Sequence, residues 1–306
     1  MPTRWSTFPV EFRGGLISNL SPLQHGINAV GSATFLQNYE PSKEGGYKKV
    51  MGYEKYIDDT VPGSGTMLGV KVANQTKVIA VRENVSNVSQ YYINSSGSWS
   101  SLGAAASLGG KVSAQDFNFN GTHKIIFVDG TNIPAVFEDA TDTLSFPSGY
   151  PSDVIGGEHV EVYKQHVFIS KGHTLSFSAP YDETDFSVAN GGGNLSIGHT
   201  ITGLKVFRDQ LFIFSRNSIQ RLVGSSVADF QLVPITEDIG CISGDTIQEV
   251  GGDVMFLAVD GLRLLGATDR IGDFSINLPS EKIEKDVLSF ISTYAYPVIS
   301  SNALFT

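Results

Sequence analysis

Five short apolar runs recur along the chain, and each is followed by a polar turn and a stretch in which apolar and polar residues alternate. One of them is LFIFSRNSIQRLVG at residues 211–224, and the same order occurs at residues 78–93, 125–137, 167–179 and 254–266. Alternation is typical of strands with one buried face, and a short run of Val, Ile and Phe is typical of a strand buried on both faces. The repeated unit is therefore a small antiparallel sheet.

The runs are evenly spaced. They begin at Val78, Ile125, Val167, Leu211 and Val254, so the unit recurs about every 43 residues. That period matches the four-stranded blade of a β-propeller. A β-sandwich gives no reason for a fixed period, and a period of two along the strands excludes a helical solenoid. The prediction is an all-β fold, a β-propeller of about five to six four-stranded blades.

The two ends of the chain depart from the repeat. Residues 1–60 are irregular and are predicted to contact a partner, to close the propeller, or both; residues 61–306 are the propeller domain. Counting one period back from Val78 reaches Phe35, which lies in the stretch SATFLQNYE. This stretch is therefore a candidate strand to close the propeller ring. Near the C-terminus, PSEKIEKDVLSFI predicts one short helix capped by Ser280, with Ile283, Val287, Phe290 and Ile291 on one face. One period beyond Val254 lies Pro297, where a sixth unit begins, so the last blade is expected to be incomplete.

Composition narrows the function. The 306 residues carry a formal net charge of −10, which disfavours tight sequence-independent binding to nucleic acid because that needs a basic face. The single cysteine excludes an intrachain disulfide. The sequence contains no run of 18 apolar residues, so it predicts no membrane-spanning helix. The N-terminal residues lack the apolar stretch of a secretion signal.

Motifs that carry chemistry are missing. Neither a nucleotide-binding GxxxxGK[ST] nor a nucleophile elbow occurs, and GGGNLSIG at residues 191–198 is better explained as a loop. Cys241 is interpreted as a small buried apolar residue, and His159, His166 and His173 are not spaced as metal ligands on a strand. The acidic stretch YDETDF at residues 181–186 is interpreted as a solvated turn. We therefore predict no catalytic, cofactor-binding or metal-binding residue, and no enzyme activity.

Basic and aromatic residues interleave in EGGYKKVMGYEKY at residues 44–56. Such interleaving occurs where a protein contacts nucleic acid or a protein partner. A strand with a solvated face is the alternative. The candidate partner-contact residues are Tyr39, Tyr47, Lys48, Lys49, Tyr53 and Lys55.

The segment GGLISNLSPLQHGINAVGSATFLQNYEPSKEGGYKKVMGYEKY at residues 14–56 resembles the opening of the tail hub, tail tubular and nozzle proteins of short-tailed bacteriophages. That family opens with Gly-Gly-Leu and Leu-Ser-Pro phrases, followed by a Gln-Asn segment and a GGY…GYE segment. Residues 176–187, 207–224 and 239–265 are also similar to it, the last through GCISGDTI followed by DG. The resemblance covers nearly the whole chain.

The resemblance implies a structural virion protein with a propeller like that of packaged-DNA stabilisation proteins. Its expected place is the phage tail, after synthesis in the host cytoplasm. Subunits would form a cyclic homo-oligomer, with a hexamer favoured, below the portal and its adaptor and beside other tail proteins or fibres. DNA would pass through the lumen during ejection without specific binding, and an acidic surface would repel its phosphates.

Two other functions stay open at this stage. A glycan-binding or depolymerase propeller would place aromatic and acidic residues at equivalent positions of several blades, yet the only tryptophans are Trp5 and Trp99. An intracellular propeller adaptor would repeat a GH…WD or kelch signature, and the sequence has neither.

Overall fold

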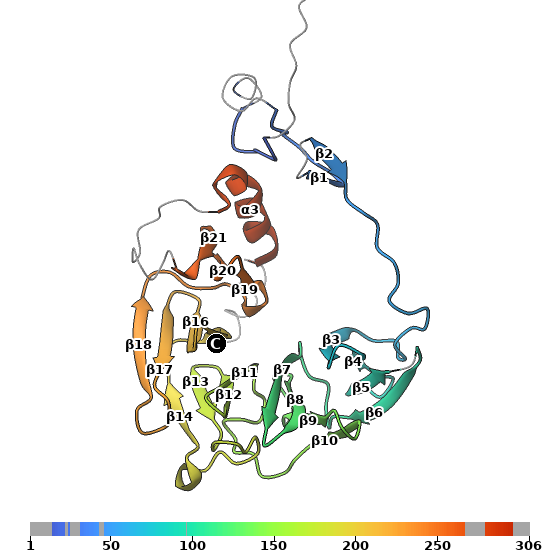
Figure 1. Cartoon of the computed structure of the whole chain (residues 1–306), viewed down its shortest axis with the longest axis vertical. Helices are drawn as coiled ribbons and strands as arrows, with labels where there is room; N and C mark the ends of the chain where they lie inside the picture. The colour runs from blue at the N-terminus through green and yellow to red at the C-terminus, as the bar shows by residue number, and fades with distance from the viewer. Residues whose placement is uncertain are drawn as a thin grey trace, which may run out of the picture.

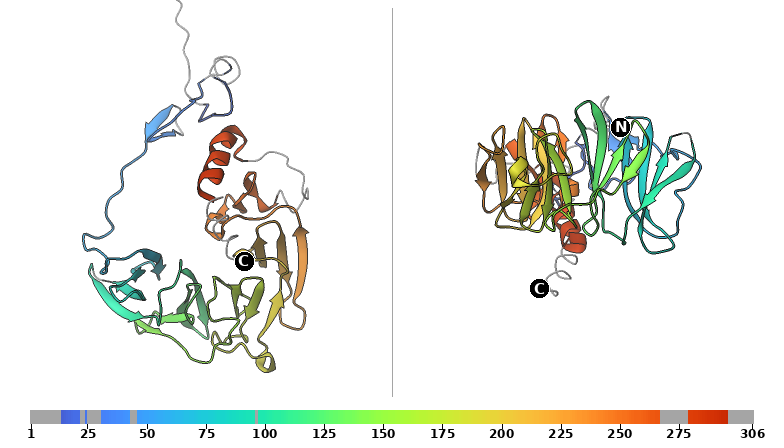
Figure 2. Two further views of the ribbon diagram at one scale, coloured as in Figure 1. Left: turned by 180° about the vertical axis from the view of Figure 1, so that it is seen from behind. Right: turned by 90° about the horizontal axis from the view of Figure 1, so that it is seen from below.

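A computed structural model describes residues 14–21, 24, 31–42, 46–95, 97–266 and 279–295. Four four-stranded sheets and one three-stranded sheet, all antiparallel, follow one another in chain order. They stand side by side in an arc around a common centre (Figures 1 and 2). This is the architecture of a β-propeller, and it confirms the all-β prediction with four complete blades and a fifth of three described strands.

The strands of each sheet are consecutive in the chain. The first sheet holds β3 (Met67–Ala73), β4 (Lys77–Glu83), β5 (Ser89–Asn94) and β6 (Trp99–Ala104). The second holds β7 (Ser113–Phe119), β8 (Thr122–Val128), β9 (Ala135–Glu138) and β10 (Thr143–Ser145). The third holds β11 (His159–Tyr163), β12 (His166–Lys171), β13 (Thr174–Phe177) and β14 (Gly193–Ser196). The fourth holds β15 (Ile201–Phe207), β16 (Gln210–Ser215), β17 (Ile219–Val223) and β18 (Gln231–Thr236). The fifth holds β19 (Gln248–Val250), β20 (Asp253–Ala258) and β21 (Gly261–Leu264).

Two consecutive residues take positive φ in the turn between the first two strands of every sheet. In the second to fifth sheets these two residues make up the whole turn, and a two-residue turn of this kind matches the right-handed twist of the strands it joins; in the first sheet Thr76 adds a third residue. Three of the five pairs contain no glycine, although the left-handed region normally favours it. The pairs are Asn74 and Gln75, Asn120 and Gly121, Lys164 and Gln165, Arg208 and Asp209, and Gly251 and Gly252.

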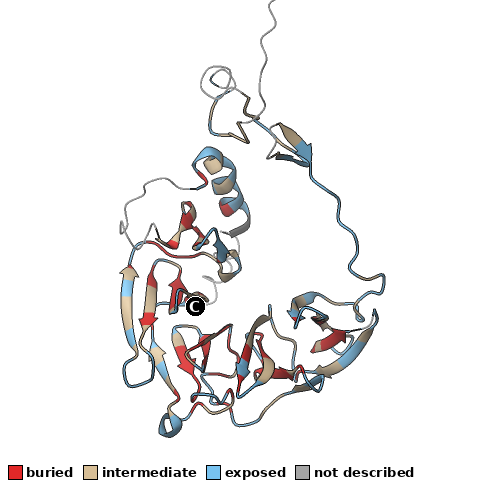
Figure 3. Cartoon of the chain, in the orientation of Figure 1, coloured by how far each residue is buried: buried red, intermediate tan, exposed pale blue. Residues whose placement is uncertain are grey.

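The core lies between neighbouring sheets, as the buried residues in Figure 3 show. In β8, Ile125 and Phe127 join the apolar cluster shared with the first sheet, whereas Ile126 and Val128 join the cluster shared with the third. A strand in this position needs apolar residues on both faces, which is why its sequence does not alternate. The five apolar runs are thus the second strands of the five sheets, β4, β8, β12, β16 and β20.

A short helical segment follows the fifth sheet. It comprises a 3₁₀ turn (Glu281–Ile283), α3 (Glu284–Phe290) and a π-helical turn (Ile291–Ala295). The prediction that Ser280 caps this helix is wrong: its side chain makes no capping bond, and its Oγ instead accepts the N–H of Leu262 on β21 at 3.1 Å. Ser280 therefore ties the helix to the sheet.

The N-terminal residues form a sheet of their own. β1 (Tyr39–Pro41) and β2 (Tyr47–Lys49) pair with each other, and within the described chain neither pairs with a propeller strand. Phe35 lies outside any strand and is 73% exposed. The first described residues instead meet the helix: Ser18 N donates to Lys282 O at 3.0 Å, and Lys285 N donates to Asn19 Oδ1 at 3.0 Å. Residues 18 and 19 are thus joined to the helical segment by hydrogen bonds, and Pro297 lies outside the described residues.

Candidate functional site

The most distinctive surface is the described chain between residues 31 and 62, which we call the arm. It contains the β1–β2 hairpin and an extended stretch that leads to the first sheet, and it stands away from the other sheets (Figures 1 and 2). Its large apolar side chains face solvent: the exposed fractions are 97% for Tyr53, 87% for Met51 and 70% for Tyr56. Phe35 and Tyr39 are exposed as well. Exposed apolar groups gathered in one segment mark an interaction surface.

The six predicted contact residues fall into two groups. Four lie on the hairpin, where Tyr39 is paired with Lys49 in the register and Lys48 Nζ lies 3.0 Å from Glu40 Oε1. Tyr47 serves the arm itself, since its Oη lies 3.0 Å from the carbonyl oxygens of both Gly15 and Gly31.

The other two predicted residues, Tyr53 and Lys55, are exposed on the extended stretch. Sequence reasoning missed Met51 and Phe35 as members of this surface. Met51 lies within the predicted stretch, and its apolar character between lysines and tyrosines was the available signal. Phe35 was assigned to a closing strand instead.

The base of the arm is fastened to the first sheet. Arg82 Nη1 on β4 donates to Val61 O at 2.6 Å, and Arg82 Nε donates to Gly65 O at 2.9 Å. On β6, Trp99 Nε1 donates to Asp59 O at 3.3 Å. These bonds fix the direction in which the arm leaves the propeller, while the aromatic stretch beyond them stays exposed.

A cavity of about 380 Å³ opens where the first strands of the sheets begin. The second to fourth sheets and the loop before the fifth sheet line it, and Lys111 and Asp245, which form an ion pair, also line a neighbouring cavity of about 470 Å³. Burial lowers the pKa of His159 in the wall, while Glu158 and Asp245 oppose that shift. On the same strand, burial raises the pKa of the Glu161 carboxyl, against the N–H of Val162 and the charge of Lys205. The lining mixes both charges and apolar groups, so it selects no single ligand class.

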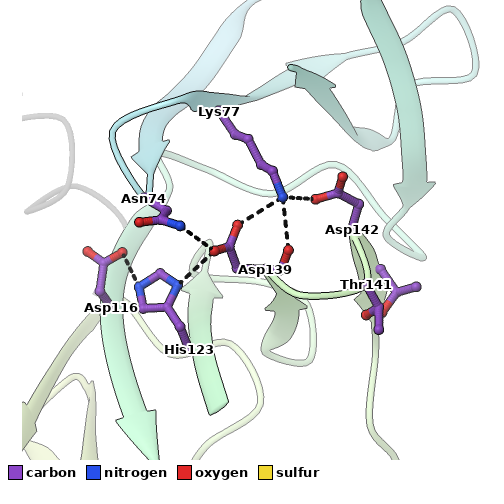
Figure 4. Close-up of polar contacts among 8 residues, drawn as sticks. Asn74, Lys77, Asp116, His123, Asp139, Thr141 and Asp142 are labelled. Atoms are coloured by element: carbon purple, nitrogen blue, oxygen red, sulfur yellow. Dashed lines mark hydrogen bonds and ion pairs between the residues drawn. The ribbon is translucent and has the colours of Figure 1, made fainter. Parts of the chain in front are cut away.

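A polar cluster connects the first two sheets (Figure 4). Lys77 Nζ on β4 lies 3.1 Å from Asp139 Oδ1 and donates to Asp142 Oδ1 at 2.6 Å. Asn74 Nδ2 donates to Asp139 Oδ2 at 3.0 Å. His123 stands between Asp116 and Asp139, with a ring nitrogen 3.6 Å from each carboxylate. Hydrogen bonding to Asp142 raises the pKa of Lys77. The cluster sets Lys77 between two aspartates from the second sheet and brings no nucleophile to the histidine, so its evident role is to lock two sheets together.

The remaining candidate side chains are structural where the chain is described. His166 is buried with its Nδ1 at 2.6 Å from Ser178 O, and Cys241 is fully buried at the fifth sheet. The YDETDF carboxylates point to different partners: Glu183 pairs with Lys124 at 2.6 Å, whereas Asp182 accepts the N–H of Thr184. Among the described residues no group of three or more His, Cys, Asp or Glu is placed to hold a metal ion.

No described helix has both the length and the apolar character that crossing a membrane requires.

Comparison with known proteins gives a likeness of shape only. No protein-family model and no curated protein matches the sequence. Among solved structures, the extracellular domain of a one-component system from B. thetaiotaomicron is 9% identical with a TM-score of 0.44, over 65% of this chain and 32% of that one. A functionally unknown protein from Desulfotomaculum acetoxidans is 10% identical with a TM-score of 0.41, over 65% and 64%. The computationally designed Ika8 protein is 11% identical with a TM-score of 0.34, over 67% and 73%.

The matched region thus spans about a third of the first of these chains and less than two thirds of the second. At such identities and scores the likeness carries no argument about function. The fold class therefore rests on the sheets of this chain.

Proposed function

We propose that this protein is a structural component of a bacteriophage tail, part of the ring below the portal and its adaptor through which DNA is ejected. The observation that carries the proposal is the arm, because Met51, Tyr53 and Tyr56 expose apolar surface that a free-standing domain has no reason to keep in water. The sequence resemblance of this same segment to tail hub and nozzle proteins indicates what kind of assembly it joins.

The propeller suits a scaffold in this proposal. Its apolar residues are used between sheets, and its charged residues in the described clusters are paired with each other, as Lys124 is with Glu183 and Lys77 with Asp139. A rigid body of this kind presents loops and rims to its neighbours. The proposal includes no catalytic step.

The net charge of −10 fits passage of DNA without binding. Acidic walls repel phosphates at separations of up to about 10 Å at moderate ionic strength, so DNA would slide and not adhere. The proposal predicts that the surface facing the lumen of the ring is acidic or neutral.

The test is whether the purified chain assembles with the geometry of a channel. Native mass spectrometry and negative-stain images of one sample would show a closed ring, with six copies favoured, and a central opening wide enough for a duplex. Addition of DNA at physiological salt should leave the mobility of both components unchanged. Tight binding of DNA by the assembled ring would contradict the sliding mechanism.

A further inference from the structure

The arm is attached at both ends within its own molecule, and the bonds at its base fix one end to the first sheet. At the other end the arm contacts residues 14–19, which we call the anchor. Tyr47 Oη on the hairpin lies 3.0 Å from Gly15 O and from Gly31 O. Ala33 N also donates to Gly15 O at 2.8 Å. The anchor and the hairpin of the arm therefore form one small unit.

The anchor in turn contacts the helical segment that follows the fifth sheet. Ser18 N donates to Lys282 O at 3.0 Å. Lys285 N donates to Asn19 Oδ1 at 3.0 Å, and Asn19 Nδ2 donates to Glu281 O. The Ser18 hydroxyl group is shielded from solvent and has no hydrogen-bond partner in the described chain, so this part of the anchor is packed as well as bonded.

The helical segment is itself joined to the fifth sheet. Ser280 Oγ accepts the N–H of Leu262. Val287 and Phe290 line an apolar cavity of about 320 Å³ together with Leu257 and Leu262. The anchor is therefore connected to the fifth sheet, whereas the base of the arm is connected to the first. Figure 1 shows the arm passing between the two ends of the arc of sheets.

Between these two attachments lies a stretch with no attachment of its own. Residues 51–58, which we call the strap, make no hydrogen bond or ion pair with any other residue that the structure describes. All of them are exposed except Ile57, which is partly buried. Eight fully extended residues reach at most about 29 Å, so the strap limits how far its two attachments can separate.

We propose that the anchor and the arm form a releasable tie that holds the first and fifth sheets together, with Ser18 and Asn19 as its latch. The latch is the weakest part of the tie, because it consists of a few hydrogen bonds and Asn19 is exposed, so water competes for them. When the latch opens, the first and fifth sheets are joined only through the sheets between them. The tie acts inside one molecule, so it goes beyond the proposed function and does not depend on it.

Hydrogen exchange with mass spectrometry measures the latch in the full chain. The latch variant is Asn19→Ala, which removes the side-chain hydrogen bonds to the helical segment. The control is Gln37→Ala, at an exposed residue of the arm whose side chain makes no hydrogen bond in the described chain. In the latch variant we expect the amides of the helical segment to exchange at least about fivefold faster than in the wild type. The amides of β12, in the third sheet, should be unchanged, and the control should match the wild type.

A cut in the strap tests the tie itself. In a second chain residues 51–56 are replaced by Leu-Val-Pro-Arg-Gly-Ser, a cleavage site for thrombin, because the strap makes no bond that this replacement would break. The folded chain is cleaved and passed over a size-exclusion column at several concentrations. After the cut only the latch holds the N-terminal piece, and the high local concentration that the strap supplied is lost.

We therefore expect the N-terminal piece to elute with the sheets at high concentration and to separate from them on dilution. With Asn19→Ala added, retention should need at least about fivefold higher concentration. Gln37→Ala should leave retention as it is in the chain with Asn19 intact.

Three results would overturn the inference. The first is an N-terminal piece that separates at every concentration with Asn19 intact. The second is an Asn19→Ala variant that changes neither exchange nor retention, because the latch would then lie elsewhere. The third is a folded chain that thrombin does not cut, since the strap would then not be exposed. Ring assembly is measured on the unaltered chain, so each of these results leaves the proposed function standing.

Discussion

The repeat allows a direct measurement of how much packing between sheets contributes to the free energy of unfolding. Val70 and Val160 occupy equivalent positions on first strands, yet Val160 is 5% exposed against the second sheet and Val70 is 63% exposed. Substitution of either by alanine removes the same atoms from the same place in a strand. The loss of β-strand propensity is therefore expected to be similar at the two positions. The difference between the two effects then reports packing alone.

The magnitudes follow from burial. Two carbons are removed, and at about 0.8 kcal/mol per buried carbon the lost transfer free energy at Val160 is about 1.6 kcal/mol. The cavity left behind raises the cost to about 2–3 kcal/mol. At Val70 most of the side chain is already in water, so the packing cost should be about 0.6 kcal/mol or less. We expect Val160→Ala to lower the free energy of unfolding by about 1.5–2 kcal/mol more than Val70→Ala does.

The assay is urea unfolding of both variants and the wild type. It should be followed by circular dichroism and tryptophan fluorescence, at a concentration where the chain is monomeric. The two signals must coincide before the midpoints are converted to free energies. Equal costs for the two substitutions would refute the claim that the second and third sheets pack as described while Val70 on the first sheet faces solvent.

Three further outcomes are expected from the same unfolding measurements. Asp139→Ala should cost about 1–3 kcal/mol because it removes the buried carboxylate that Asn74 and Lys77 both contact, while Lys77 keeps Asp142 and the main-chain oxygen of residue 139; the matched change Asp142→Ala, at the more exposed end of the same lysine, should cost less than about 1 kcal/mol, and similar costs would place the lock elsewhere. Gly121→Ala should cost about 1–2 kcal/mol because its φ of 83° disfavours a side chain, and Gly52→Ala, in open space without a positive φ, should be nearly neutral. Burial raises the pKa of Glu161, so the folded protein holds that proton more tightly than the unfolded chain and the stability linked to it is lost as pH rises above about 4.5. Glu161→Gln should accordingly raise the urea midpoint at pH 7, with the gain vanishing in acid, and a gain that is the same at pH 3 and pH 7 would contradict this linkage.

The repeat could be predicted from sequence because each second strand is buried on both faces. Ile125 and Phe127 point to one neighbouring sheet and Ile126 and Val128 to the other, so the run could not alternate without exposing polar groups to the core. The polar pairs after each first strand likewise had to form turns. The apolar run and the polar turn pair are both local sequence patterns, and each occurs once in every sheet.

Other features were beyond the sequence because they depend on long-range geometry. Ser280 has the chemistry of a helix cap, but a vacant N–H on β21 takes its hydroxyl group instead. Tyr47 was predicted only as a contact residue, and its hydrogen bonds to two carbonyl oxygens within the N-terminal region had no sequence signal. The cluster of Asn74, Lys77, His123 and Asp139 joins residues from two separate repeats. No local sequence pattern could therefore predict it.

The exposure of the arm could be predicted only in part. Lysines and tyrosines marked residues 44–56, a stretch that includes Met51, whereas nothing in the sequence showed that Phe35 would be left without a core to enter. That information lies in how the hairpin leaves the first sheet, and therefore in the bonds from Arg82 and Trp99 to the arm base.

The central claim is that this propeller is a part of an assembly, and the mass of its assemblies tests that claim most directly. Native mass spectrometry of the purified full chain, with negative-stain images of the same sample, should give a single closed ring with a central opening. A chain that stays monomeric at every accessible concentration would contradict the account.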